Sequence, residues 1–233
     1  MAAEQGSPGM PKDVAELAVG VLGGTGDQGR GLAYRLGRAG HPVLIGSRSI
    51  ERAEAAAAGL GTSARGLANA DVAREADLVI VAVPWDGHRD LLASLAGPLA
   101  GKIVIDCVNP LGFDKLGAYP LPVAEGSAAE QAAAVLPGST VVGAFHHVSA
   151  VALLDPEVAS VDLDVMVLGD DRQATDLVQA LAARIPGVRG IYAGRLRNCG
   201  QVEALTANLV SVNRRYKAHA GLRITDVHLS VNF

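Results

Sequence analysis

Residues 19–36 read VGVLGGTGDQGRGLAYRL, and this stretch decides the fold. Residues 17–22 are apolar and predict a buried strand, while residues 28–39 show the apolar spacing of an amphipathic helix. Between them stands a glycine-rich turn that fits the pattern GxGxxG. A turn of this kind, placed between a strand and a helix, binds the pyrophosphate of a dinucleotide with the free N–H groups of the helix N-terminus.

The turn therefore predicts a dinucleotide-binding loop whose residues are Gly24, Thr25, Gly26, Asp27, Gln28 and Gly29. We expect Gly24 to permit the tight turn, Gly26 to let a pyrophosphate approach the backbone, and Gly29 to let helix and strand pack closely. A plain turn with spare glycines is the alternative. The position between a strand and a helix makes that alternative the weaker one.

Strand-length and helix-length segments alternate along the rest of the chain. Strands are predicted at residues 43–47, 63–66, 77–83, 102–108, 140–145, 163–168 and 190–193, and helices at residues 50–58, 68–75, 88–95, 127–135 and 173–183. Short connections between such segments imply parallel strands joined by right-handed crossovers. The predicted fold class is α/β: a Rossmann-type, doubly wound, mostly parallel sheet with a small, mainly helical C-terminal segment.

The second predicted strand ends in Ser47 and Arg48, and this ending indicates which dinucleotide binds. An NAD enzyme places Asp or Glu there, about 20 residues beyond the glycines, to bind the ribose hydroxyls. A hydroxyl and a guanidinium instead bind the 2′-phosphate of NADP, which a carboxylate would repel. Arg52 lies four residues beyond Arg48, and Thr25 adds a hydroxyl from the loop. The sequence thus favours NADP over the alternative that both arginines are solvated surface cations.

Three regions are expected: a flexible N-terminal tail at residues 1–16, an NADP-binding Rossmann domain at residues 17–194, and a small C-terminal segment at residues 195–233. Residues 111–122 (LGFDKLGAYPLP) are rich in Gly and Pro and predict a long loop. Residues 202–216 predict a helix. Beyond them, alternation like that of a strand is seen for Val227, Leu229, Val231 and Phe233.

Composition excludes several classes of protein. Of 233 residues, 49% are hydrophobic and 19% charged, which is typical of a globular chain. No apolar stretch reaches the roughly 20 residues of a membrane span, and the formal charge of −4 argues against a nucleic-acid surface. Cys107 and Cys199 stand far apart, so neither a disulfide framework nor a metal site is expected. The first residues lack an apolar segment of the signal-peptide type, so we expect a cytoplasmic protein.

Four segments together resemble the NADPH-dependent reductases of coenzyme F420, a hydroxy-deazaflavin. They are residues 23–48 (GGTGDQGRGLAYRLGRAGHPVLIGSR), Val83-Pro84-Trp85, residues 144–147 (AFHH) and residues 203–206 (EALT). The resemblance extends from residue 17 to about residue 223. It implies reversible hydride transfer between nicotinamide and deazaflavin. It also implies a homodimer in which the C-terminal segment packs beside the Rossmann domain and helps to form the deazaflavin pocket.

The resemblance also implies roles for single residues. Thr25 to Gln28, Ser47, Arg48 and Arg52 would hold NADP, and Val83, Pro84, Trp85, Val108 and Asn109 would line the nicotinamide side. His146 would lie where the two rings meet, together with Val148 to Ala150, and would orient or polarise the deazaflavin. Members of the family often have Pro where this chain has Ser149, and residues 198–203 differ in their charged positions.

The residues themselves leave several roles open. Trp85 contacts a ligand or packs on the helix predicted at residues 88–95, and His88 contacts nicotinamide or caps that helix. Cys107 is interpreted as a small core residue. A cationic cluster either forms a solvated face or attracts an anionic second cofactor: Arg195, Arg197, Arg214, Arg215 and Lys217. Two other functions stay open, another NADP-dependent reductase of the imine or pyrroline-carboxylate type and a non-enzymatic NADP-binding module.

Overall fold

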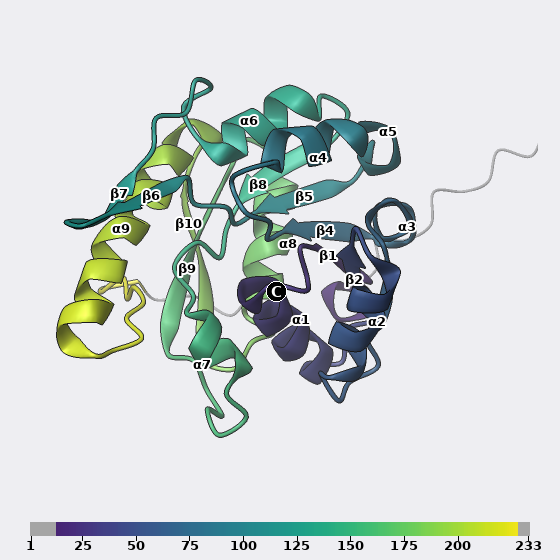
Figure 1. Ribbon diagram of the computed structural model, residues 1–233, viewed down its shortest axis with the longest axis horizontal. Helices are drawn as coiled ribbons and strands as arrows, with labels where there is room; N and C mark the ends of the chain where they lie inside the picture. Colours follow the sequence, from purple (N-terminus) through teal and green to yellow (C-terminus); the bar gives the residue numbers. More distant parts are fainter. Residues whose placement is uncertain (1–12, 228–233) are drawn as a thin grey trace, which may run out of the picture.

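An eight-stranded sheet forms the centre of the molecule (Figure 1). The computed structural model describes residues 13–227. The order of the strands across the sheet is β10-β9-β8-β5-β4-β1-β2-β3. Their bounds are β1 Val19–Leu22, β2 Val43–Ser47, β3 Arg65–Ala68, β4 Leu78–Val81, β5 Ile103–Asp106, β8 Thr140–Gly143, β9 Leu163–Gly169 and β10 Val188–Gly194.

The strands from β8 across to β3 all pair in parallel. This is the strand order of the doubly wound dinucleotide-binding fold, in which the connections change direction between β1 and β4. β9 pairs antiparallel with β8, and β10 pairs parallel with β9. The predicted class, a Rossmann-type and mostly parallel sheet, is confirmed.

Helices cover both faces of this sheet (Figure 1). Their bounds are α1 Asp27–Arg38, α2 Ile50–Ala58, α3 Asn69–Glu75, α4 His88–Ser94, α5 Ala96–Leu99, α6 Ala128–Val135, α7 Ala150–Leu154, α8 Arg172–Ala182 and α9 Cys199–Tyr216, with short 3-10 helices at Val14–Glu16 and Leu196–Asn198. Side chains of Ser49, Ser127 and Asp171 cap α2, α6 and α8 by accepting a backbone N–H three residues further on. The predicted starts of these three helices lie within one residue of the observed ones.

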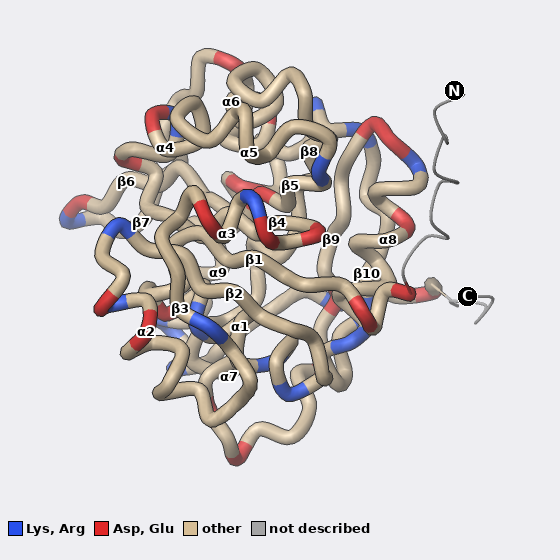
Figure 2. Tube along the Cα trace, turned by 90° about the vertical axis from the view of Figure 1, so that its right-hand side faces the viewer, with Lys and Arg blue, Asp and Glu red and all other residues tan. Residues whose placement is uncertain are grey.

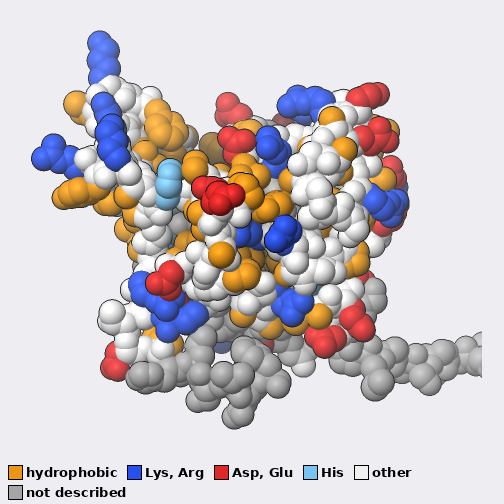
Figure 3. Space-filling view, turned by 90° about the horizontal axis from the view of Figure 1, so that it is seen from below, with side chains coloured by type: hydrophobic (Ala, Val, Ile, Leu, Met, Phe, Trp, Pro, Cys, Tyr) orange, Lys and Arg blue, Asp and Glu red, His pale blue; other side chains and the backbone are white. Residues whose placement is uncertain are grey.

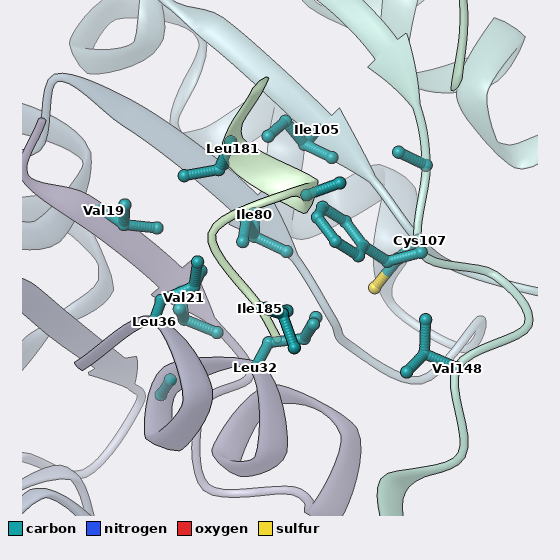
Figure 4. Close-up of a cluster of buried hydrophobic side chains, with 14 of the residues drawn as sticks. Val19, Val21, Leu32, Leu36, Ile80, Ile105, Cys107, Val148, Leu181 and Ile185 are labelled. Carbon is teal, nitrogen blue, oxygen red and sulfur yellow. The ribbon is translucent and has the colours of Figure 1, made fainter. Parts of the chain in front are cut away.

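The core has two layers, one on each face of the sheet. In β4, Leu78 and Ile80 belong to one layer, while Val79 and Val81 belong to the other. Figure 4 shows part of the first layer, where side chains of α1 and α8 pack with those of β1, β4 and β5. Because both faces are buried, the central strands are continuous apolar runs, and this makes them recognisable in the sequence.

Residues 111–122 form a β-hairpin, so the prediction of a long loop is wrong. β6 Leu111–Asp114 pairs antiparallel with β7 Gly117–Pro120. The Asp114 carboxylate accepts the backbone N–H groups of Leu116 and Gly117 at 2.7 and 3.1 Å, and Gly117 has a φ of +128°. Gly and Asp therefore build a tight turn here rather than an irregular segment.

The other predicted elements are present, with shifted ends. The strand expected at residues 63–66 is β3, two residues further on, and the helix expected at residues 88–95 is α4 followed by the separate α5. α9 begins three residues before the expected helix, and α7 was not predicted. Within the expected tail, Val14–Glu16 is a 3-10 helix. Val227 is not part of a strand, and Leu229, Val231 and Phe233 lie outside the described residues.

Charged residues of both signs lie side by side around the outside of the molecule (Figure 2). In the described part of the chain, no helix combines the length and apolar character needed to cross a membrane. Both cysteines are buried and free.

Candidate active site

A cavity of about 350 Å³ opens at the carboxyl ends of β4, β5 and β8. Ligand pockets typically span roughly 300–1,000 Å³, so this cavity is large enough for a small aromatic ligand or ring. The segments that follow the three strands form one wall, and α9 forms another. The lining residues are Gln28, Ala82, Val83, Pro84, Trp85, Cys107, Val108, Asn109, His146, His147, Val148, Ser149, Thr206, Leu209, Val210, Asn213 and Ala220.

The cavity gathers predicted site residues that are far apart in the sequence. Those that line it are Gln28, Val83, Pro84, Trp85, Val108, Asn109 and His146. Ala150 is not among its lining residues, because it starts α7 just beyond the lining residue Ser149. The remaining predicted cofactor residues do not line the cavity and lie near the starts of α1 and α2. They are Gly24, Thr25, Gly26, Asp27, Gly29, Ser47, Arg48 and Arg52.

The glycine loop leads from β1 to the N-terminus of α1. Gly26 is the N-cap residue of α1, and no side chain in the described part of the chain caps this helix, so its first N–H groups face outward for an anion. At Gly29, a Cβ would lie 2.6 Å from the Gly23 carbonyl oxygen, so only glycine allows this close packing. The tight turn depends on Gly23, with a φ of +78°, and not on Gly24 as expected. Gly24 instead packs against the Ile45 side chain, where a Cβ would come within 2.8 Å.

The end of β2 presents Arg48 and Arg52 on an exposed surface. Ser49 caps α2 by accepting the Arg52 N–H at 3.3 Å, and Ser47 Oγ accepts the Ser49 N–H at 3.2 Å. Within residues 13–227, no side chain pairs with either guanidinium. The Ser49 hydroxyl donates to Glu51 at 2.6 Å, which lowers the pKa of this nearby carboxyl group. A hydroxyl and two guanidinium groups without a side-chain partner in the described structure therefore follow the end of β2, and such groups can bind a phosphate.

The glycine loop and the cavity are in direct contact. Gln28, in the first turn of α1, donates from Nε2 to the backbone carbonyl of Phe145 at 3.4 Å. Phe145 follows β8 and has a φ of +65°, a left-handed conformation that is uncommon for a bulky residue. Strained backbone of this kind is concentrated at functional sites, and here it precedes the cavity residue His146.

His146 is buried, and neither of its ring nitrogens has a partner in the described structure. Burial lowers the pKa of His146 to about 4, with a smaller contribution from His147 in the same direction and an opposing one from Asp106. The ring is therefore neutral at physiological pH, with one nitrogen that donates and one that accepts. Such a ring can orient a polar ligand edge, but it does not carry a proton to release at neutral pH.

His88 neither lines the cavity nor caps its helix, so neither of its expected roles is found. Its side chain is fully buried, with Nε2 at 2.7 Å from Asp106 Oδ2 and Nδ1 at 3.1 Å from Gln131 Oε1. Burial acts to lower the pKa of His88, but the bonds to Asp106 and Gln131 outweigh it and raise the pKa. Asp106 also accepts the backbone N–H of Val108 at 2.9 Å. The His88–Asp106 pair thus fixes the start of the cavity segment that contains Val108 and Asn109.

Three cavity residues carry polar atoms that are buried and without a hydrogen-bond partner in the described structure. These atoms are Asn109 Oδ1, Thr206 Oγ1 and the two ring nitrogens of His146. Nearly all buried polar atoms in native proteins have partners, because an unpaired one costs free energy. Polar groups converging on a partly apolar cavity are the usual composition of a cofactor site, so the residues present fit a ligand with polar ring edges.

Sequence reasoning missed most of the α9 wall. Thr206, Leu209, Val210 and Asn213 are spaced i, i+3, i+4 and i+7, and they present one helix face to the cavity. This spacing is readable in the sequence, but an ordinary core-facing helix has it too. Trp85 packs on α4 as one alternative expected, with its ring centroid 5.5 Å from that of His88. It also lines the cavity, and its contact with a ligand stays a prediction.

The C-terminal cations are not part of the cavity lining. Arg195 donates to the Asp170 carbonyl at 3.0 Å. Arg214, Arg215 and Lys217 border a separate groove of about 640 Å³ between α9 and the β6–β7 hairpin. Figure 3 shows Lys and Arg side chains projecting on the left, the side on which α9 and the hairpin lie in Figure 1.

Known proteins are similar to this chain in sequence and in fold. A family profile described as "NADP oxidoreductase coenzyme F420-dependent" matches residues 18–110. The F420-dependent NADP reductase of Methanothermobacter marburgensis is 39% identical over 223 residues, covering 91% of this chain and 99% of that protein. The F420-dependent NADP reductase of Methanocaldococcus jannaschii is 38% identical over 226 residues, covering 91% and 100%.

A solved structure from Arthrobacter sp. FB24, described provisionally as an F420-dependent NADP reductase, has a TM-score of 0.76 and 28% identity. It matches 90% of this chain and 99% of its own. The curated relatives align over nearly their whole length at well above 30% identity. The chain therefore belongs to the family of F420-dependent NADP reductases.

Proposed function

We propose that this protein catalyses reversible hydride transfer between NADP(H) and the deazaflavin coenzyme F420. One observation carries the proposal: the glycine loop adjoins a cavity in which polar atoms of Asn109, His146 and Thr206 have no partner in the described structure. The relatives' description as F420-dependent NADP reductases supports this choice of cofactors.

NADP(H) is assigned to the loop and the edge of the sheet beside it. The N–H groups at the start of α1 bind the pyrophosphate, because no side chain in the described structure caps them. Ser47, Arg48 and Arg52 bind the 2′-phosphate with charge-assisted hydrogen bonds. The nicotinamide then reaches the cavity along Val83 to Trp85, beside Val108 and Asn109.

The protein's contribution to the chemistry is mainly positioning. When both cofactors are bound, the reduced nicotinamide supplies a hydride from C4 to the acceptor carbon of the deazaflavin. The cavity residues must hold the two rings at roughly 3–3.5 Å, the distance of a near-attack geometry. Val83, Val108 and Val148 give the lining its apolar part and exclude water. Neutral His146 orients the deazaflavin by hydrogen bonding and is not an obligatory proton donor.

A spectrophotometric assay with NADPH and coenzyme F420 tests this function, because reduction bleaches the visible absorption of the deazaflavin. We expect bleaching with NADPH and a much slower reaction with NADH. An imine or pyrroline-carboxylate reductase would oxidise NADPH only with a cyclic imine or related acceptor. A non-enzymatic module would bind NADPH and show no turnover with any of these acceptors.

We also propose that this chain pairs with a second copy of itself to form a homodimer. Two large apolar side chains of the β6–β7 hairpin are exposed, Phe113 by 68% and Leu116 by 95%. We define the hairpin face as these two residues, which both line the groove between the hairpin and α9. The two elements lie side by side, since α9 packs against β7 (Figure 1). Exposed apolar patches of this kind usually mark a protein interface.

A further inference from the structure

Glu203 is a buried carboxylate of α9 that connects this helix to another element. Its side chain is 3% exposed. Oε2 accepts the backbone N–H of Ala128 at 2.8 Å, and Oε1 accepts that of Ala129 at 3.2 Å. Both donors belong to the first turn of α6, where backbone N–H groups have no partner inside the helix. Glu203 therefore docks α9 on the N-terminus of α6 with both of its oxygens.

This contact is not needed to begin α6, because the helix has a cap of its own. Ser127 Oγ accepts the Glu130 N–H at 3.0 Å, as an N-cap side chain does, and its hydroxyl donates to Glu130 Oε2 at 2.9 Å. Glu203 satisfies the two remaining donors from outside the helix. Its position thus serves the packing of one helix on another.

The same turn of α9 is attached to the cavity wall at a second point. His147 Nε2 donates to the backbone carbonyl of Val202 at 2.7 Å. α9 also approaches the loop that precedes α6 closely at Gly200. A Cβ on Gly200 would lie 2.7 Å from the Gly126 carbonyl oxygen. The position of α9 along and around its axis is therefore fixed at its N-terminal half, beside the cavity.

Thr206 lies three residues beyond Glu203, and it is the first residue of the α9 face that lines the cavity. Residues three apart on a helix lie close together, so a rotation that releases Glu203 also moves Thr206. We infer that Glu203 is a positioning residue that holds the α9 wall in place for the deazaflavin. This inference rests on the proposed function, because it assigns the α9 side of the cavity to the second cofactor.

The pKa of the Glu203 carboxyl group depends on its burial, on its two backbone donors and on nearby charges. Burial is the main cause that raises the pKa of Glu203 to about 7, and the charge of Asp106 acts in the same direction. The N–H groups of Ala128 and Ala129 and the charge of His88 lower this pKa. Glu130 is the nearest acidic group on α6 that bonds to the same helix end. A protonated or amide side chain in place of the carboxylate can accept fully at only one oxygen, so it leaves one N–H of α6 unpaired.

Glu203→Gln tests the inference, with Glu130→Gln as the matched control. Both substitutions replace a carboxyl group by its amide at the N-terminus of α6, but only the first changes a contact with α9. We expect Glu203→Gln to raise the KM for coenzyme F420 about tenfold, a typical effect of losing a charge-assisted hydrogen bond. The KM for NADPH and kcat should stay within about threefold of wild type. Glu130→Gln should leave the KM for coenzyme F420 unchanged.

The inference is overturned if Glu203→Gln leaves the KM for coenzyme F420 unchanged, or if the KM values of both cofactors rise equally. If that variant does not fold, Glu203→Asp replaces it, and a selective increase in the KM for coenzyme F420 is again required. Failure of the proposed function looks different, because the wild-type protein would then not bleach coenzyme F420 with NADPH at all.

Discussion

The side-chain amide of Asn109 donates a hydrogen bond to the backbone carbonyl of His146 at 3.1 Å. This bond joins the segment after β5 to the segment after β8 at the wall of the cavity. The amide oxygen of the same side chain has no partner in the described structure. Asn109 therefore holds His146 in place and at the same time keeps a buried acceptor without a partner at the cavity wall.

Asn109→Asp should remove the bond to His146 while keeping an acceptor oxygen and the shape of the side chain. A carboxylate cannot donate to the His146 carbonyl, and its charge is repelled by that oxygen. We expect the KM for NADPH to rise about tenfold and the free energy of unfolding to fall by about 1–2 kcal/mol. Steady-state kinetics and urea unfolding measure the two effects. Asn208→Asp, on the exposed side of α9, is the control and should change neither.

Arg48→Asp should lower the affinity for NADPH much more than that for NADH. The substitution removes a donor to the 2′-phosphate and adds a charge that repels it, so we expect a loss of about 10- to 100-fold for NADPH. Calorimetric titration with both dinucleotides measures the difference. The control Arg172→Asp makes the same charge change on the exposed surface of α8. Equal losses for NADPH and NADH would contradict the assignment of the 2′-phosphate to Arg48.

His146 should make the protein less stable as the pH falls from about 6.5 to about 4, its folded pKa. In this window the unfolded chain takes up a proton that the folded chain does not, so unfolding becomes easier at lower pH. The contribution amounts to about 3 kcal/mol. Across this pH range, urea unfolding should show a larger fall in the free energy of unfolding for the wild type than for His146→Gln. The other titrating groups contribute equally to both proteins, so the difference reports His146. The same pH dependence in both proteins would contradict the burial of a neutral ring.

The same variant also tests the role of His146 in the reaction. With orientation as its role, His146→Gln should weaken binding of coenzyme F420 or slow hydride transfer modestly, by about tenfold or less. Single-turnover absorption measurements at saturating cofactor separate the two effects. Complete loss of transfer with both cofactors bound would show instead that His146 is an obligatory catalytic group.

Arg35 on α1 should contribute strongly to stability. Its guanidinium is buried and donates at 2.7–3.0 Å to four backbone carbonyls of residues 152–158, in and after α7. Arg35→Met leaves these carbonyls without their donor, and we expect the free energy of unfolding to fall by about 3 kcal/mol. Arg38→Met, at the exposed end of the same helix, should cost less than about 1 kcal/mol. Similar losses for both variants in urea unfolding would show that the carbonyls find other partners.

The hairpin face should form the contact between two copies of the chain. Leu116→Asp combined with Phe113→Asp places two charges in this face, so we expect a dimer to become a monomer in sedimentation experiments. Val151→Asp changes an exposed apolar residue of α7 and should leave the dimer intact. A wild-type monomer, or a dimer that survives both charges on the hairpin, would contradict this interface.

Much of the fold can be predicted from the sequence because its signals are local. The central strands are buried on both faces, so β4 and its neighbours are continuous apolar runs. The capping residues Ser49, Ser127 and Asp171 mark the starts of three helices. The glycine pattern marks the dinucleotide loop, because close packing at Gly29 tolerates no side chain. Each of these signals depends on residues close together in the chain.

What could not be predicted depends on partners that are distant in the sequence. His88 pairs with Asp106 and Gln131, and nothing near His88 in the sequence indicates either contact. The face of α9 has the spacing of any core helix, and only the folded chain shows that a cavity lies beside it. The hairpin formed by β6 and β7 resembles a loop in the sequence, because Gly and Pro are frequent in both.

Transfer of deuterium from NADPH labelled at C4 of the nicotinamide is the most direct test of the central claim. Purified protein is mixed with labelled NADPH and coenzyme F420, and the reduced deazaflavin is analysed by mass spectrometry. If the two rings meet in the cavity, the product carries the label from nicotinamide and no hydrogen from solvent at the acceptor carbon. A product without the label, or no reduction although both cofactors bind, would contradict the account.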